Sequence, residues 1–154
     1  RDNVNILFVC TGNTCRSPMA QGILKEKAKE NGLDIVVKSA GIYALDGQNA
    51  SENAIKSLAL DDIDISSHRA NIIHRDLVKE ADLILTMGNS HREVLISKYD
   101  FIKNKTYTLK KFAYGIDEDV RDPFGGDINV YNNTKEELKK ALDEVVKKLK
   151  EECK

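Results

Sequence analysis

A short apolar run that leads into a Cys-x5-Arg stretch constrains this chain more than any other sequence feature. Residues 4–9 (VNILFV) are mostly apolar, which is typical of a buried strand. Apolar residues at helical spacing follow from Met19 to Asn31. Before them, Ser17 resembles a helix N-cap and Pro18 the first residue of a helix. The sequence therefore predicts a strand, a tight turn and a helix N-terminus in direct succession.

The turn at residues 10–17 has the composition of an anion-binding site. Successive backbone N–H groups in such a turn point at one spot, and the helix dipole adds positive potential there. The turn also carries a thiol, Cys10, and a guanidinium group, Arg16. Gly12 and Asn13 suit a backbone that needs positive φ or a close approach to a ligand.

The spacing alone leaves two interpretations of this stretch. In one, it is an ordinary strand-to-helix turn with an incidental cysteine and arginine. In the other, Cys10 attacks phosphorus as a thiolate while the amides and Arg16 hold the phosphoryl oxygens. The same donors are expected to lower the pKa of the Cys10 thiol. The strand before the turn, the helix after it, and Gly12 and Asn13 within it favour catalysis.

Residues 10–20 (CTGNTCRSPMA) resemble the phosphate loop of the low molecular weight protein tyrosine phosphatases. They are most similar to the bacterial protein arginine phosphatase branch of that family. Further motifs that resemble the family follow in its order: 39–41 (SAG), 67–70 (SHRA), 81–87 (ADLILTM) and 122–126 (DPFGG). Together these motifs span nearly the whole chain at the spacing usual for the family.

Strand and helix patterns alternate along the chain, which is typical of an α/β fold with a parallel sheet. Further strands are expected at residues 35–38, 83–87 and 106–109. The resemblance implies a four-stranded parallel sheet in the order 2-1-3-4, with helices on both faces and the phosphate loop after the first strand. Residues 110–127 lack periodicity and are expected to form one long loop. The resemblance starts the last helix near Asp127.

Length and composition limit the possible partners. We expect a single domain over residues 1–154, long enough for its own core. Lys and Arg (24) balance Asp and Glu (25), so no basic surface for nucleic acid or an anionic membrane is expected. No apolar run approaches the length of a membrane span. Three cysteines without the spacing of zinc ligands suggest a reducing cytoplasm.

The resemblance also implies a mechanism and its catalytic residues. Cys10 attacks phosphorus, Arg16 binds the equatorial oxygens, and Asp122 protonates the leaving group. Asp122 then acts as a base when water hydrolyses the phosphocysteine intermediate. An isolated Asp-Pro pair is usually a turn, but the place of Asp122 after the last strand matches the general acid of the family. No metal ion or other cofactor is expected.

Further positions in the loop and around it have implied roles. The substrate-binding residues implied by the resemblance are Thr11, Gly12, Asn13, Thr14, Cys15 and Ser17. Ser39 and His68 are supporting residues, and His68 is expected to hold Asn13. Ser17 is expected to assist the Cys10 thiolate as a leaving group. We also expect Cys15 to capture an oxidised Cys10 as a reversible disulfide.

One position bears on substrate specificity, and two others follow the third strand. Thr11 follows the nucleophile, where tyrosine-specific relatives usually carry a bulkier aliphatic residue. The resemblance therefore implies a preference for phosphoarginine, with phosphotyrosine proteins as the alternative substrates and inorganic phosphate as the product. Many relatives have an acidic residue where this chain has Gly88. His91 is expected to point to solvent.

Other function classes fit the sequence less well. Thioredoxin-linked arsenate reductases share the fold but need two further cysteines near the third strand, and residues 83–99 contain none. Cysteine phosphocarrier domains lack both the loop arginine and the Asp-Pro acid. A catalytically dead phosphoprotein-binding module is disfavoured because Cys10, Arg16 and Asp122 are all present.

Overall fold

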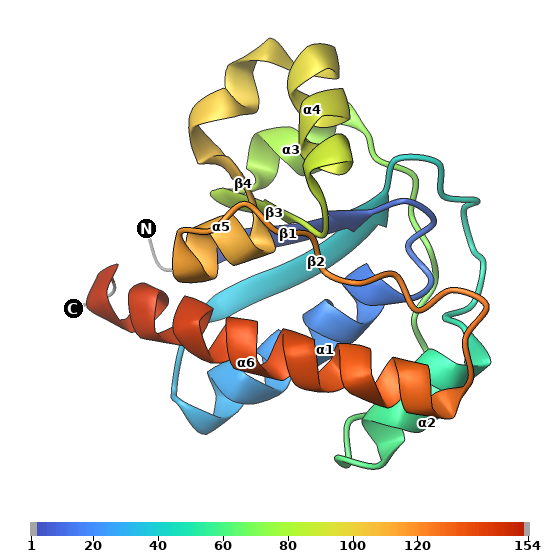
Figure 1. Ribbon diagram of the computed structural model, residues 1–154. Coiled ribbons are helices and arrows are strands. Elements are labelled where there is room, and N and C mark those ends of the chain that lie inside the picture. The colour runs from blue at the N-terminus through green and yellow to red at the C-terminus, as the bar shows by residue number, and fades with distance from the viewer. Residues whose placement is uncertain (1–2, 153–154) are drawn as a thin grey trace.

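Four parallel strands form the centre of the protein (Figure 1), as the computed structural model of residues 3–152 shows. The strands are β1 (Val4–Cys10), β2 (Ile35–Gly41), β3 (Leu83–Thr86) and β4 (Thr106–Thr108). β1 pairs with β2 on one side and with β3 on the other, and β4 pairs with β3. The order β2-β1-β3-β4 confirms the predicted α/β fold and strand order.

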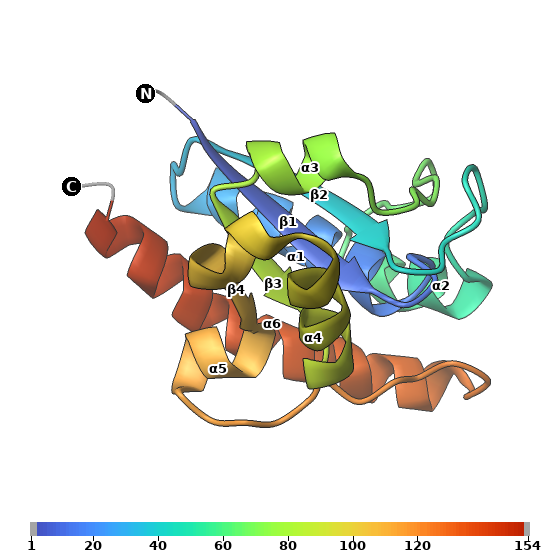
Figure 2. The same cartoon turned by 90° about the horizontal axis from the view of Figure 1, so that it is seen from above.

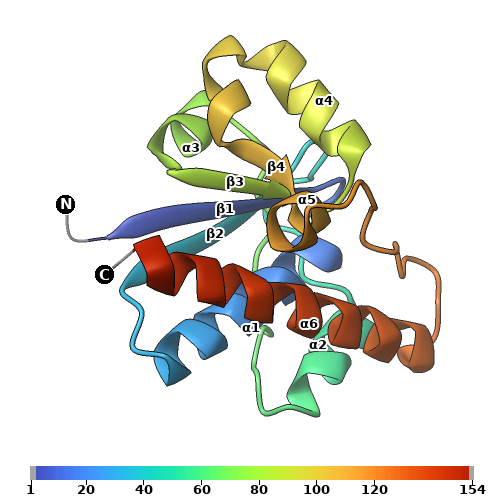
Figure 3. The same cartoon turned by 60° about the vertical axis from the view of Figure 1, so that its left-hand side comes forward.

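Helices cover both faces of this sheet, as predicted. The helices are α1 (Arg16–Glu30), α2 (Glu52–Ala59), α3 (Arg75–Glu80), α4 (Asn89–Lys98), α5 (Leu109–Tyr114) and α6 (Ile128–Glu152), with the 3-10 helix η1 (Asp100–Lys105) after α4. α1, α2 and α6 lie below the sheet in Figure 3, whereas α3 and α4 lie above it. The view from above shows α3 and α4 in front of the strands (Figure 2).

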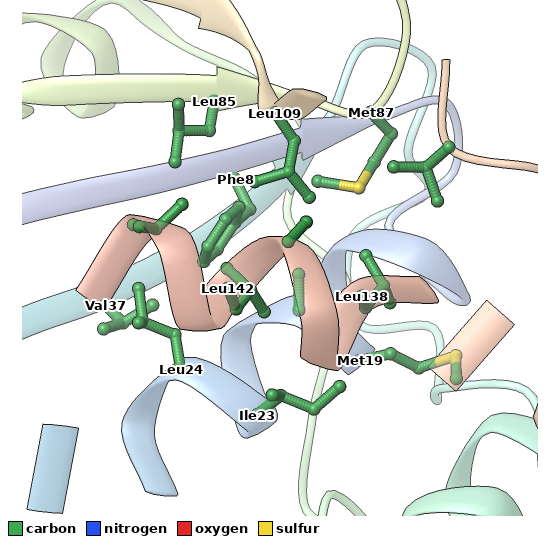
Figure 4. Packing of buried hydrophobic residues seen from close by; sticks show 14 of the residues in the cluster. Phe8, Met19, Ile23, Leu24, Val37, Leu85, Met87, Leu109, Leu138 and Leu142 are labelled. Atoms are coloured by element: carbon green, nitrogen blue, oxygen red, sulfur yellow. The ribbon is translucent and has the colours of Figure 1, made fainter. Parts of the chain in front are cut away.

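β1 carries apolar side chains on both of its faces because each face packs against helices. Residues 6–9 are each at most 1% exposed. Phe8 packs with Met19 and Ile23 of α1 and with Leu142 of α6 (Figure 4). On the opposite face, the next residue along the strand belongs to a second cluster with α3 and α4. A central strand of a parallel sheet is covered in this way, which explains the continuous apolar run in the sequence.

The segment from 110 to 127 is not one long loop, which corrects the prediction. Its first residues belong to α5. The Thr108 hydroxyl caps this helix by accepting a hydrogen bond from the Lys111 amide at 3.2 Å. Gly115 ends the helix in the left-handed conformation, with φ of +76°. Thr108 and Gly115 are ordinary helix start and stop signals, and they outweigh the weak periodicity of so short a helix.

The carboxyl ends of the strands bring distant segments to one edge of the sheet. β1 ends at Cys10 and β2 at Gly41, and the two residues are paired. The chain after α5 returns to this edge, where the Val120 amide donates to the Met87 carbonyl at 2.8 Å. This edge is where ligands bind in open parallel sheets. Among residues 3–152, no helix is both long and apolar enough to cross a membrane.

Candidate active site

A cavity of about 320 Å³ opens at this edge, above the turn that joins β1 to α1. It is lined by Cys10, Thr11, Gly12, Thr14, Cys15, Arg16, Gln48, Asp122 and Phe124. The cavity brings together the three residues predicted to be catalytic, although Asp122 is more than a hundred residues from Cys10 in the sequence. We call residues 10–17 the phosphate loop from here on.

Asn13 fixes the shape of the phosphate loop. Its φ of +58° is left-handed, as predicted, and its side chain is buried. The amide nitrogen donates to the hydroxyls of Ser17 at 2.8 Å and Ser39 at 2.9 Å. The amide oxygen accepts from the backbone of Asn71 at 2.9 Å. The Asn13 side chain is therefore fully engaged inside the protein and does not line the cavity.

Ser39 and His68 both form hydrogen bonds with Asn13. The His68 Nε2–H donates to the Asn13 carbonyl at 2.8 Å. Burial lowers the pKa of His68, although its hydrogen bond to Asn13 opposes that shift. A neutral ring suffices for this bond, so the support does not depend on protonation. The Ser39 hydroxyl accepts from Asn13 and donates to Gln21, which links the loop to β2 and α1.

Glycine stands at position 12 of the loop and at position 41 beside it for different physical reasons. Gly12 does not take a positive φ, which corrects that part of the prediction, and a Cβ there would meet only the Thr14 hydroxyl, at 3.8 Å. Gly41, in contrast, has no room for a side chain. Its Cβ would lie 2.5 Å from the Thr11 carbonyl oxygen and 2.9 Å from the Asn13 nitrogen. Gly41 belongs to the 39–41 motif, but its residue type alone did not reveal that it packs against the backbone of the phosphate loop.

Ser17 does not cap α1, because the helix already begins at Arg16 and Cys15 holds the N-cap position. Its hydroxyl oxygen lies instead 2.8 Å from the Cys10 sulfur. Since that oxygen also accepts from the Asn13 amide, the hydroxyl hydrogen is free to donate to sulfur. Ser17 is therefore placed to stabilise a negative charge on Cys10.

Cys10 lines the cavity and is only 3% exposed. Burial raises the pKa of the Cys10 thiol, whereas the Ser17 hydroxyl, the Ser17 and Asn13 amides and the charge of Arg16 lower it. The net shift is upward, so the prediction of a lowered thiol pKa is wrong. The sequence indicates which donors surround the sulfur, but it does not show that folding removes the thiol from solvent, which disfavours the thiolate.

Arg16 and Asp122 also line the cavity. One Arg16 nitrogen donates to the Val120 carbonyl at 3.0 Å, and the other lies 3.6 Å from an Asp122 carboxylate oxygen. The Arg16 side chain is buried, whereas that of Asp122 is 56% exposed. The Phe124 amide donates to the second Asp122 oxygen at 3.1 Å. Asp122 therefore stands at the mouth of the cavity, where a leaving group would be found.

A buried lysine holds the segment that carries Asp122. Lys110 of α5 lies 2.7 Å from Glu118 and 2.5 Å from Glu137 of α6. Burial by itself lowers the pKa of Lys110, but the two carboxylates raise it above its usual value. Glu137 also accepts from the Arg121 amide at 3.3 Å. These contacts connect α5 and α6 to the backbone next to Asp122.

His91 is only 7% exposed, so the prediction that it points to solvent is wrong. Its Nε2 lies 2.9 Å from the Thr11 hydroxyl oxygen, and its Nδ1 accepts from the Gly88 amide at 3.1 Å. The position on α4 gave no sign of this contact, because Thr11 is 80 residues away in sequence. Burial and the charge of Arg16 lower the pKa of His91.

Gly88 makes room for an acidic group that comes from another segment. A Cβ at Gly88 would lie 2.9 Å from a carboxylate oxygen of Asp119. The other Asp119 oxygen accepts from the Asn89 amide at 2.9 Å, at the start of α4. Asp119 thus places a carboxylate directly beside Gly88.

Cys15 contacts a hydroxyl cluster on the far side of the loop. Its sulfur lies 3.3 Å from the Tyr131 hydroxyl and 3.6 Å from that of Ser51. Burial raises the pKa of Tyr131 to about 12, so the phenol stays neutral. Cys10 and Cys15 are free thiols in the structure, and the disulfide between them stays a prediction.

A family model and a known relative both match nearly the whole chain. The family model described as low molecular weight phosphotyrosine protein phosphatase matches residues 5–154. The protein-arginine-phosphatase of Bacillus subtilis (strain 168) is 38% identical over 149 residues, which are 97% of this chain and 99% of that protein.

Solved structures agree in both fold and sequence. A low molecular weight protein tyrosine phosphatase from T. tengcongensis is 45% identical with a TM-score of 0.91, and the match covers 94% of this chain and 99% of that one. A YwlE arginine phosphatase mutant with a phosphorylated active-site serine is 38% identical with a TM-score of 0.93, covering 96% of each chain. The chain therefore belongs to the low molecular weight phosphotyrosine protein phosphatase family, as its motifs indicated.

Proposed function

We propose that this protein is a protein phosphatase that works through a phosphocysteine intermediate on Cys10 and prefers phosphoarginine. The observation that carries the proposal is the cavity shared by Cys10, Arg16 and Asp122. The loop amides and Arg16 supply the positive charge that a transferring phosphoryl group needs, so the proposed reaction uses no metal ion.

In the first step, the Cys10 thiolate attacks phosphorus. The S–P bond forms as the bond from phosphorus to the leaving nitrogen breaks, and the Asp122 carboxyl donates its proton to that nitrogen. Arg16 and the loop amides bind the three equatorial oxygens. Burial raises the pKa of the Cys10 thiol, which opposes formation of the thiolate. The Ser17 hydroxyl stabilises that form through its contact with sulfur.

In the second step, water attacks the phosphocysteine. The Asp122 carboxylate takes a proton from the water, the new O–P bond forms and the S–P bond breaks. Inorganic phosphate leaves, and Ser17 donates to the departing Cys10 thiolate. The exposure of Asp122 at the cavity mouth allows it to serve both the leaving group and the incoming water.

Two features support phosphoarginine as the preferred substrate. Thr11, rather than a bulkier aliphatic residue, lines the cavity next to Cys10. Asp122 at the mouth would pair with a guanidinium group through charge-assisted hydrogen bonds. The similarity to the Bacillus subtilis protein-arginine-phosphatase agrees with this preference.

Phosphotyrosine is the second candidate, and Phe124 is the observation that favours it. This ring lines the cavity and is 79% exposed, so it offers an apolar face to an aryl group. The tyrosine phosphatase from T. tengcongensis supports the same candidate. Arsenate reduction is disfavoured because residues 83–99 lack the cysteines it requires.

Other parts of the proposal concern the whole protein. Phosphorylated proteins are the proposed partners, with inorganic phosphate as the product. A cytoplasmic location is supported by the free thiols of Cys10 and Cys15. A single domain is supported by the one sheet over which residues 3–152 are arranged.

The substrate preference is tested with two peptides that differ only in carrying phosphoarginine or phosphotyrosine. We expect the wild-type protein to have the higher kcat/KM on phosphoarginine. Thr11→Ile should move the ratio toward phosphotyrosine by at least roughly tenfold, about 1.4 kcal/mol of transition-state binding. Thr134→Ile, the same change at a threonine of α6 that does not line the cavity, is the control and should leave the ratio unchanged. A wild-type preference for phosphotyrosine that Thr11→Ile leaves unchanged would favour the second candidate.

A further inference from the structure

Asp119 is a carboxylate close to the site that the proposed mechanism does not use. It lies shortly before Asp122, in the segment that joins α5 to α6, and this segment passes the start of α4 (Figure 3). Its side chain contacts Gly88 and Asn89 at that start, and Asn89 is 30 positions earlier in the sequence. The contact therefore joins two segments that are distant along the chain.

The first turn of α4 needs a hydrogen-bond acceptor, and Asp119 supplies one. The first amides of a helix have no partner within the helix, and an N-cap side chain usually accepts from one of them. Gly88 holds the N-cap position of α4 and has no side chain. The Asp119 Oδ1 accepts from the Asn89 amide at 2.9 Å instead, where the helix dipole stabilises its negative charge.

The Asp119 carboxylate fits beside α4 because residue 88 is a glycine. A Cβ at Gly88 would lie 2.9 Å from the Asp119 Oδ2 and 3.0 Å from its Cγ. The Gly88 φ is −148° and its ψ is 165°, which is the extended region that all residues adopt. Backbone conformation is therefore not the reason for glycine here. The reason is the close approach of Asp119, which a side chain at position 88 would prevent.

The residue after Asp119 is attached at the same place by its backbone. The Val120 amide donates to the Met87 carbonyl at 2.8 Å, and the Val120 carbonyl accepts from Arg16 at 3.0 Å. Residues 119 and 120 are thus held by the start of α4, by the residue after β3 and by the phosphate loop. The side chain of Asp122, in contrast, is 56% exposed. Its place depends on the backbone that leads to it.

We propose that Asp119 is a positioning residue that sets the place of Asp122 for protonation of the leaving group by binding the start of α4. The inference rests on the phosphatase function proposed above and concerns the same cavity. Proton transfer requires the Asp122 carboxyl to lie within hydrogen-bond reach of the leaving atom, and a displacement of about 1 Å can cost on the order of 100-fold in rate. Asp119 limits such displacement because it fixes the segment to a helix outside the phosphate loop.

The experiment uses a series of aryl phosphates whose leaving phenols increase in pKa. The measured quantity is the slope of log kcat/KM against the pKa of the phenol. Because kcat/KM includes only the steps up to departure of the leaving group, it reports on Asp122 as an acid and not on the later hydrolysis. A well-placed acid makes the slope shallow, whereas a displaced acid slows the substrates with poor leaving groups most.

We expect Asp119→Ala to lower kcat/KM by roughly tenfold for the phenol of highest pKa and by less than about twofold for the phenol of lowest pKa. Asp119→Asn keeps an oxygen that can accept from the Asn89 amide, so it should stay within about twofold of the wild type throughout the series. In an Asp122→Ala background, Asp119→Ala should not change the slope further. Asp117→Ala, at an 89% exposed carboxylate of the same segment, is the matched control and should leave the slope unchanged.

A second variant reaches the same contact from α4. Gly88→Ala introduces the Cβ that would displace the Asp119 carboxylate, so it should make the slope steeper, as Asp119→Ala does. In an Asp119→Ala background the space is free, and Gly88→Ala should have no further effect. This comparison between backgrounds tests the contact even if Asp119→Ala lowers the thermal stability of the protein.

Three results would overturn the inference. An unchanged slope in Asp119→Ala, with or without a uniform loss of rate, would mean that Asp119 only stabilises the fold. Equal effects of Asp119→Asn and Asp119→Ala would mean that its charge matters and its contact with α4 does not. An effect of Gly88→Ala that persists in the Asp119→Ala background would contradict the contact itself. Failure of the proposed function is distinct, because an inactive wild-type protein or an active Cys10→Ser variant would contradict the phosphatase.

Discussion

Some residues of the site hold the phosphate loop in shape, whereas others are free to contact the nucleophile or the substrate. The Asn13 side chain is fully hydrogen-bonded inside the protein, so it holds the loop. Ser17 has one hydrogen free for the Cys10 sulfur, so it acts on the reacting atom. Asp122 is exposed and near Arg16, so it is available to the substrate. The chemistry depends on which side chains are already hydrogen-bonded within the protein and which are free to contact the reacting groups. Residue types alone do not show this difference.

Ser17→Ala is expected to raise the pKa of the Cys10 thiol further. The Ser17 hydroxyl stabilises the thiolate, so its removal leaves burial less opposed. At a given pH below the midpoint, less thiolate is then present and alkylation by iodoacetamide is slower. The rate at Cys10 is followed by mass spectrometry over a range of pH in phosphate-free buffer. Ser57→Ala, which removes a buried hydroxyl from α2, is the control, and an unchanged or lower midpoint for Ser17→Ala contradicts the assignment.

Asp122→Ala is expected to slow turnover of phosphorylated peptides by roughly 10²–10⁴, the usual effect of removing a positioned acid. p-Nitrophenyl phosphate should be affected least, because its leaving group needs little protonation. Asp117→Ala removes a carboxylate that is 89% exposed in the same segment, and it should leave both rates nearly unchanged. Equal slowing of the two substrates by Asp122→Ala would indicate that Asp122 only shapes the cavity.

Among the elements, α5 and α6 position the segment that carries Asp122. Lys110 of α5 contacts Glu118 in that segment and Glu137 in α6. The Lys110 side chain is only 8% exposed, so its contacts are less screened by solvent than those of surface lysines. The segment is further attached through Val120 to Met87, directly after β3, and to Arg16 of α1. The segment that carries the proposed general acid is therefore held by these contacts to three helices and to the residue that follows β3.

Lys110→Met is expected to slow turnover of phosphorylated peptides by up to roughly tenfold, because a displaced acid protonates the leaving group poorly. Hydrolysis of p-nitrophenyl phosphate should change less. Lys111→Met, at a neighbouring lysine whose side chain is 50% exposed, is the matched control. Steady-state kinetics on both substrates checks the result, and an equal loss in the Lys111 variant would refute this positioning role.

At the scale of the whole molecule, the sequence could predict what depends on neighbouring residues. The order of the strands, the phosphate loop and the left-handed Asn13 follow from local patterns and from motifs in the family's order, whereas the short helix α5 was missed. The buried His91 could not be predicted in the same way, because its environment is made by Thr11 from a distant part of the chain. The raised pKa of Cys10 was missed for a related reason, since burial is a property of the folded protein.

The central claim is that Cys10 carries the phosphoryl group between the two steps. Wild-type protein is mixed with a phosphoarginine peptide, quenched in acid within the first turnover, and digested for mass spectrometry. We predict a phosphorylated peptide that contains Cys10, formed before phosphate is released and absent in Cys10→Ala. Phosphate released without any phosphorylated Cys10, or a phosphoryl group found on His68 or His91 instead, would contradict the account.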